Sequence, residues 1–273
     1  MNLTDVQQPP RAPRRSLWAQ GVEVGSVEPR VLDALNRATP SGPEVWTDLL
    51  HPLEQENTVR YAVKPDFNQN LAVLAERLRA CGCCGPWRHE RLPVFDAQGR
   101  PWAEVERGAV RVLGLCTQAV HLVGVRSDGC IWVQQRSWNK PNDPGLWDTL
   151  MGGTVSAGED LAETLRRETW EEAGLHLNTL TGLKWGGQFT ATRPVPDGGD
   201  AGYLVEDTHW FTVTVPVEQV PVNQDGEVDH FEAWTPAQVG QASAQGRFTP
   251  EARWVLAQVL AVPSGSPSPP VPG

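Results

Sequence analysis

The sequence predicts an α/β protein: an α/β/α sandwich with a mixed sheet, preceded by a small α+β domain. Short apolar runs at 119–125 and 130–136 precede a helix-like segment. Strand-like runs around 209–217 and 228–234 and a closing helical segment at 250–261 follow it. Strands, one helix, strands again and a last helix are typical of a sheet covered by helices on both faces. A helix and hairpins upstream of these runs predict the smaller domain.

The first part of the chain divides into a terminal segment and this smaller domain. Residues 1–15 and the tail 263–273 are rich in Pro with Arg, Gln or Ser. Such segments bury too little apolar surface to offset the entropy of ordering, so we expect both to be disordered. Residues 16–110 are the predicted α+β domain. Within it, apolar residues recur at helical spacing over 68–81, and Gly82 is a natural helix stop.

Residues 111–262 form the predicted sandwich domain. Asp128-Gly129, between two apolar runs, is a strong hairpin signal. Gly152 and Gly153 are expected to form a turn after a strand. A helix is expected from about Asp160 to Ala173, where a glycine follows that can supply a left-handed cap.

The charge of the chain narrows the class of its partners. The net charge is −10, whereas nucleic-acid surfaces need clustered Lys and Arg. We therefore expect no nucleic-acid partner and a small phosphorylated molecule instead. An acidic protein that binds a polyphosphate must offset repulsion, and a divalent cation between carboxylates and phosphate oxygens does this.

The apolar runs of the sequence bear on where the protein is located, and the number of cysteines bears on whether its thiols are reduced. No apolar run approaches the ~20 residues that cross a bilayer, and the first residues lack the apolar core of a secretory signal. We expect a cytoplasmic monomer or homodimer with no membrane partner. Five cysteines, an odd number, favour reduced thiols over a disulfide framework. The Cys81–Cys84 cluster resembles a zinc site only in part, since His89 does not complete a finger spacing.

Three glutamates gather near the end of the helix expected at 160–173. At about 100° per residue, Glu168, Glu171 and Glu172 fall within an arc of about 100°. Such crowding near a negative helix C-terminus is unfavourable unless cations neutralise it. Oxygen-only ligands of this kind suit Mg²⁺ or Mn²⁺. Taken alone, the three residues fit a solvated acidic face as well.

A spaced motif surrounds these glutamates and resembles the Nudix box, G-x(5)-E-x(7)-R-E-U-x-E-E-x-G-U, in which U is a bulky apolar residue. The residues at the matching positions are Gly153, Glu159, Arg167, Glu168, Glu171, Glu172, Gly174 and Leu175. Thr169 at the first U is the one soft departure, and a β-branched residue of similar bulk can pack there. So many fixed positions are a specific signal for the Nudix hydrolase superfamily.

The resemblance implies a role for each matching residue and a Nudix sandwich for the fold. In that family the glutamates at Glu168, Glu171 and Glu172 hold the divalent metals that activate the attacking water. Arg167 would pair with Glu159 and brace the loop. Gly153 would let the backbone come close to metal and phosphate.

Several charged residues outside the box are candidates to bind the substrate. Arg136, Lys140 and Arg193 could grip a diphosphate, or equally lie on a solvated surface. Glu227 could be an extra metal ligand or general base, or an exposed hairpin residue.

Two of the twelve tryptophans flank the same region. Trp138 and Trp147 could face an aromatic ligand, although packing is the commoner role for a single tryptophan.

The flanks of the box resemble one Nudix subgroup more closely. The segments 120–155, 192–199 and 223–234 are similar to Nudix enzymes that act on thiamine diphosphate and carry an extra N-terminal domain. Residues 16–110 are similar to that domain. The resemblance implies hydrolysis of thiamine diphosphate, or of its oxidised analogues, to the monophosphate.

Three alternatives remain open at this stage. One is a Nudix hydrolase of nucleoside diphosphate compounds such as ADP-ribose, and another is a Nudix fold that binds without catalysis. The third is an isopentenyl diphosphate isomerase-like protein, which residues 135–153 also resemble. Residues 148–151 lack the cysteine that such an isomerase needs to deliver a proton.

Overall fold

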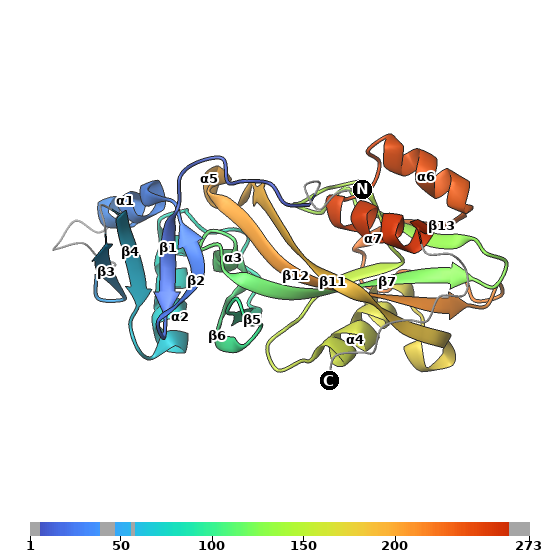
Figure 1. The fold of residues 1–273 in the computed structure, drawn as a ribbon, viewed down its shortest axis with the longest axis horizontal. Coiled ribbons are helices and arrows are strands. Elements are labelled where there is room, and N and C mark those ends of the chain that lie inside the picture. Colours follow the sequence, from blue (N-terminus) through green and yellow to red (C-terminus); the bar gives the residue numbers. More distant parts are fainter. Residues whose placement is uncertain (1–5, 39–46, 56–57, 262–273) are drawn as a thin grey trace.

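In the computed structural model, residues 6–38, 47–55 and 58–261 form a small sheet and a large sheet that follow one another along the long axis (Figure 1). The tail expected to be disordered, 263–273, lies outside these residues. No helix in the described part of the chain is long and apolar enough to span a membrane. The cytoplasmic location expected from the sequence stays a prediction.

The small sheet has four strands in the order β2-β1-β4-β3. Its elements are β1 (Arg15–Ala19), β2 (Val22–Val27), α1 (Pro29–Arg37), β3 (Leu50–Gln55), β4 (Thr58–Val63) and α2 (Phe67–Ala80). Helix α2 confirms the helix expected over 68–81. It buries Leu71, Leu74 and Leu78, and Gly82 follows its end with a φ of 72°.

The large sheet has nine strands and is mixed, as predicted. Its strands are β5 (Arg91–Phe95), β6 (Pro101–Glu106), β7 (Cys116–Arg126), β8 (Ile131–Arg136), β9 (Trp147–Asp148), β10 (Met151–Thr154), β11 (Thr181–Val195), β12 (Gly202–Val215) and β13 (Val228–Trp234). The main order is β11-β12-β7-β5-β6, with β8 and β10 also paired to β7. Strands β7 and β12 run parallel, whereas the other pairs are antiparallel.

Helices cover both faces of the large sheet, which confirms the α/β/α sandwich (Figure 1). Helix α4 (Leu161–Ala173) lies on one face, and α6 (Pro236–Ala244) and α7 (Pro250–Ala261) lie on the other. A separate buried apolar cluster fills each interface. The short helices α3 (Arg107–Val110) and α5 (Asp197–Asp200) connect strands, and the 3₁₀ turn η2 (Leu177–Thr179) connects α4 to β11.

The hairpin β5–β6 links the two sheets. Phe95 of β5 pairs with Cys116 of β7, so the hairpin belongs to the large sheet by backbone pairing. Its side chains Leu92 and Val94 pack in the same buried cluster as Leu71 of the N-terminal region. Because this core is shared, the division into 16–110 and 111–262 stays a proposal.

Of the N-terminal residues 1–15, expected to be disordered, residues 1–5 lie outside the described residues, and 6–15 contact the rest of the fold although 7–11 are exposed. Val6 is fully buried. The backbone N–H of Gln8 donates to the carbonyl of Thr192 at 2.7 Å, and the N–H of Thr192 donates to Val6 at 2.8 Å. The guanidinium of Arg14 donates to two buried backbone carbonyls at 2.6 and 2.7 Å. Composition counts apolar side chains only, so it misses order that comes from backbone pairing and one buried arginine.

Candidate active site

The three glutamates of the motif lie in the C-terminal half of α4. Asp160 starts the helix with a capping box, and Gly174 ends it with a φ of 64°, as predicted. Thr169, at the soft position of the motif, is fully buried, and its hydroxyl donates to the carbonyl of Leu165 at 2.5 Å. This packing fixes the rotation of the helix, so the glutamates face β10 and the adjoining cavity.

Glu172 is the most deeply buried of the three, with 2% of its surface exposed. Its Oε2 accepts hydrogen bonds from Nε2 of Gln134 at 2.9 Å and from the backbone N–H of Gly152 at 3.0 Å. Burial raises the pKa of Glu172 to about 8, even though the charge of Lys140 and these two hydrogen bonds act in the opposite direction. The chain therefore holds a carboxylate where its charge is costly without a cation.

Arg167 holds the other carboxylates of the motif. Its Nε and Nη2 donate to the two oxygens of Glu159 at 2.6 and 2.8 Å. Its Nη1 lies 2.9 Å from Glu168 and 2.8 Å from Glu171. Burial raises the pKa of Glu168 to about 7, against the lowering effect of Arg167. The predicted pairing of Arg167 with Glu159 is thus present in the structure.

The two glycines before the helix lie in a strand and not in the turn that we expected. Gly152 and Gly153 belong to β10 and pair with β7 at His121 and Val120. Gly153 is needed for space: a Cβ there would lie 2.3 Å from Cδ of Glu168. The glycine therefore serves close packing of the glutamate helix on the strand, whereas sequence reasoning assigned it to a turn.

The carboxylates at this point are ligands of the type that divalent cations prefer. The carboxylate of Glu168 lies against the backbone of Gly153, where no side chain intervenes. Within the described residues, no three His, Cys, Asp or Glu side chains are arranged to hold a metal. In this structure the guanidinium of Arg167 neutralises Glu168 and Glu171.

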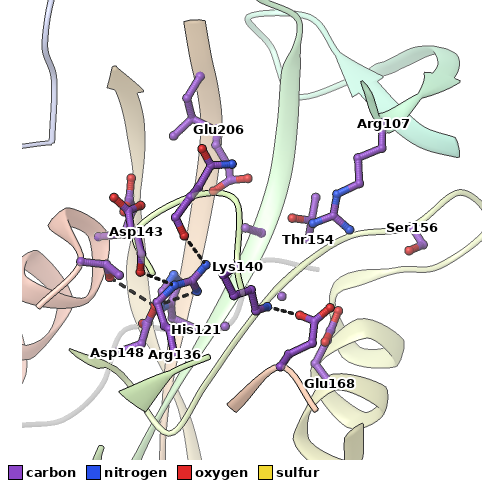
Figure 2. Close-up of a pocket in the computed structure, with 18 of the residues that line it drawn as sticks. Arg107, His121, Arg136, Lys140, Asp143, Asp148, Thr154, Ser156, Glu168 and Glu206 are labelled. Atoms are coloured by element: carbon purple, nitrogen blue, oxygen red, sulfur yellow. Dashed lines mark hydrogen bonds and ion pairs between the residues drawn. The ribbon is translucent and has the colours of Figure 1, made fainter. Parts of the chain in front are cut away.

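A polar cavity of about 480 Å³ opens beside the glutamates (Figure 2). Glu168, Glu171, Gly153 and Arg167 line it. A second hollow of about 250 Å³ shares part of this lining and extends toward the N-terminal region. Charged side chains from both parts of the molecule therefore line these two adjoining hollows. They include Arg107 and Arg111, which line both hollows.

The predicted charged residues outside the motif all line this cavity. Lys140 forms an ion pair with Glu227. Burial tends to raise the pKa of Glu227, but the hydrogen bond and charge of Lys140 outweigh it and hold that pKa below its usual range. Arg136 donates to the carbonyls of Asn142 and Asp143 at 3.1 and 3.2 Å, so it also holds the loop before β9 in place.

The two tryptophans do not line the cavity. Trp138 is 67% exposed, and its ring covers Gly145. Trp147 is buried and packs against Trp234, with ring centroids 4.4 Å apart. Because Trp138 is not among the residues that line either hollow, its role in substrate binding stays a prediction.

Sequence reasoning missed several residues of the cavity wall. They are Glu90, Arg107, Arg111, His121, Asp143, Asp148, Glu206 and Glu251. Some carried a visible signal: His121 and Glu206 are polar residues inside apolar strands. The signal did not say that β7 and β12 lie side by side, and this pairing brings the two residues to one wall.

The cysteines show no sign of a metal site. All five are free, and Cys81, Cys83 and Cys84 pack partly buried against the N-terminal core. Burial raises the pKa of Cys84 to about 12, so its thiol is protonated at neutral pH.

Comparison with solved structures supports the fold. The chain resembles the crystal structure of DR0079 from Deinococcus radiodurans with a TM-score of 0.51 and 20% identity. The match covers 62% of this chain and 98% of that one. A sequence identity of 20% supports a shared fold only.

Curated relatives share more of the sequence. Nudix hydrolase 24, chloroplastic, from Arabidopsis thaliana is 32% identical over 173 residues, which are 59% of this chain and 44% of that protein. The uncharacterized protein YJR142W of Saccharomyces cerevisiae is 25% identical over 190 residues, 64% of this chain and 54% of that protein. The chain thus spans about half the length of these relatives.

A match to a family model shows to which protein family the chain belongs. The model described as NUDIX domain matches residues 117–259, more than half of the 273-residue chain. This range contains the whole motif and the helix that carries it. On this match, the chain belongs to the Nudix family.

Proposed function

We propose that the protein hydrolyses the diphosphate linkage of a small organic diphosphate with the help of Mg²⁺ or Mn²⁺. The observation that carries the proposal is the deep burial of Glu172 and the partial burial of Glu168 beside a polar cavity that Lys140 and Arg107 also line. Buried carboxylates suit a cation, and the cationic side chains across the cavity suit phosphate oxygens.

The residues that would hold the cation are Glu168, Glu171 and Glu172, with the backbone of Gly153. A bound divalent ion supplies charge stabilisation on phosphate and lowers the pKa of a bound water. Arg167 keeps the glutamates in place through its pair with Glu159.

The other wall of the cavity would bind and orient the diphosphate. Lys140 and Arg107 offer positive charge to its oxygens, and Arg136 keeps the intervening loop in position. Glu227 is our candidate to accept a proton from water, because Lys140 keeps this carboxylate ionised.

For the substrate we propose thiamine diphosphate or its oxidised analogues, with the monophosphate as product. The support is the resemblance of the segments around the motif and of residues 16–110 to that subgroup. No Trp, Tyr or Phe of the described residues lines either hollow, so the heterocycle would be recognised through polar groups and not by stacking. Few apolar side chains line the two hollows, so an isoprenoid chain would have little apolar surface to contact. This argues against the isomerase alternative.

The test is an assay of diphosphate cleavage with Mg²⁺ across thiamine diphosphate, its oxidised analogues, ADP-ribose and nucleotides, in which the organic monophosphate products are separated by chromatography. Wild type is compared with Glu172→Gln and with Glu218→Gln, a control at an exposed position outside the cavity. We expect Glu172→Gln to lose at least about 100-fold in turnover, as for removal of a metal ligand or its support, while the control keeps full activity. Equal turnover of wild type and Glu172→Gln would remove this residue from the mechanism. Cleavage of ADP-ribose alone, seen as AMP and ribose 5-phosphate, would replace the thiamine assignment and keep the assignment as a hydrolase.

A further inference from the structure

The end of the cavity away from α4 is acidic. Four carboxylates line it: Asp143 in the loop before β9, Asp148 of β9, Glu206 of β12 and Glu251 of α7. We call these four residues the acid pocket. Figure 2 shows Glu206 and Glu168 at opposite ends of the drawn site. The acid pocket is therefore separate from the glutamates of the motif.

Positive charge is scarcer than negative charge in the acid pocket. Arg193 is shared between two of the carboxylates, at 2.6 Å from Asp143 and 2.9 Å from Glu251. Arg136 lies 3.4 Å from Asp148. These two guanidinium groups thus form ion pairs with three of the four carboxylates, and His121 lies 3.5 Å from Asp148. In the described part of the chain the fourth carboxylate has no ion pair.

Glu206 is this fourth carboxylate. Only 9% of its surface is exposed, and the parallel pairing of β12 with β7 places it beside Thr117. The hydroxyl of Thr117 donates to Oε2 at 3.4 Å, and no other described group donates to either oxygen. Arg111, whose charge also acts on Glu206, forms its ion pair with Asp197 at 3.5 Å. Burial raises the pKa of Glu206.

A buried carboxylate with so few donors costs free energy, which a ligand that donates to it would recover. Glu206 lines both hollows, so a ligand in the cavity can reach it. We propose, building on the proposed diphosphate hydrolysis, that the acid pocket is a subsite for a positively charged or amino-bearing group of the substrate, remote from the diphosphate, and that Glu206 accepts a hydrogen bond from it.

The two ends of the cavity would then select for a substrate with two unlike ends. Lys140 and Arg107 attract the diphosphate, while the acid pocket attracts the cationic or amino group. A substrate of this kind binds in one orientation, because reversing it would place like charges together.

The experiment compares Glu206→Gln with wild type and with Asp207→Asn. Asp207 is the next residue of β12, so its side chain points to the opposite face of the strand, and it does not line the cavity. Two substrates are used with Mg²⁺: thiamine diphosphate, which carries a cationic ring and an amino group, and ethyl diphosphate, which carries neither. A second measurement follows the binding of thiamine and of adenosine, without phosphate or metal, by calorimetry.

We expect Glu206→Gln to raise the KM for thiamine diphosphate by about 10- to 100-fold, the worth of a hydrogen bond to a charged group. Its kcat and its kinetics with ethyl diphosphate stay those of wild type, and its binding of thiamine weakens to the same degree. Asp207→Asn leaves all of these values unchanged.

Three outcomes would contradict the subsite. The first is that wild type and Glu206→Gln show the same ratio of kcat/KM for thiamine diphosphate over ethyl diphosphate, and the second is that Asp207→Asn raises the KM for thiamine diphosphate as much as Glu206→Gln does. The third is that wild type binds neither thiamine nor adenosine. Failure of the hydrolase itself looks different. Wild type would then release no phosphate from either diphosphate, and the calorimetry would still test the acid pocket.

Discussion

Replacement of Glu172 by glutamine should stabilise the metal-free protein at alkaline pH. Both hydrogen bonds to this side chain end on Oε2, and an amide oxygen can accept both. The substitution therefore keeps the shape and the donors of the site and removes only the charge.

The direction in which stability changes with pH follows from the pKa of Glu172, which burial raises from 4.5 to about 8. Between these values the folded protein keeps a proton that the unfolded chain has released. The free energy of unfolding therefore falls as the pH rises through this window, and it levels off above about pH 8. Glutamine does not titrate, so its advantage is absent near pH 4 and largest above pH 8.

The gain in unfolding free energy from Glu172→Gln is at most about 1.4 kcal/mol for each pH unit between the two pKa values, or about 5 kcal/mol in total. Water entry and relaxation lower it, and we expect about 1 to 3 kcal/mol, or a rise in Tm of roughly 3 to 10 °C for a chain of this size. Urea unfolding in EDTA at about pH 5 and pH 9 measures it, with Glu218→Gln as the control.

Added Mg²⁺ completes the test. It should raise the Tm of wild type at alkaline pH and raise that of Glu172→Gln much less, because the ligand charge is gone. A loss of stability in Glu172→Gln that is equal at both pH values would refute the reasoning, since it would mean that packing and not charge decides the role of this side chain.

Three further substitutions test the site. Gly153→Ala places a Cβ 2.3 Å from Cδ of Glu168, so we expect a loss of about 1 to 3 kcal/mol in unfolding free energy and weaker Mg²⁺ activation in a metal titration. Arg167→Lys keeps the charge but loses the two-point contact with Glu159; turnover should fall about 10- to 100-fold, and unchanged kinetics would deny the bracing role. Trp138→Ala should change kcat/KM by no more than about twofold, because the ring lies outside the cavity; a large rise in KM would return it to the substrate site.

Gly240→Ala is a matched control for the glycine substitution. This helical glycine has an ordinary φ, and an added Cβ would meet nothing within 4 Å. We expect it to be neutral or slightly stabilising, since alanine favours a helix by about 1 kcal/mol over glycine.

The sequence predicted the helix α4, its C-terminal glycine cap and the glutamates that it carries, because all of these depend on residues only a few positions apart. Gly174 ends the helix and Thr169 packs inward, as local spacing indicated. The strand identity of Gly152 and Gly153 was missed because glycine serves both turns and close packing. Only the neighbouring Glu168 decides between them.

Residues that come together through sheet topology could not be predicted in the same way. Glu206 lies beside Thr117 because β12 and β7 pair in parallel, across 89 positions of sequence. Hydrophobic patterning marks each strand but carries no information on which strands are neighbours. The acid pocket was for this reason invisible until the fold was known.

The hairpin β5–β6 has a consequence for how the molecule can be divided. Its backbone is bonded to one sheet and its side chains are packed in the core of the other. A cut at residue 110 would expose apolar surface on the N-terminal piece and would leave the β7 edge of the remainder without its hairpin partner. The two halves should therefore melt as a single cooperative unit, and the N-terminal half is better regarded as a wall of the enzyme than as a module that can be exchanged.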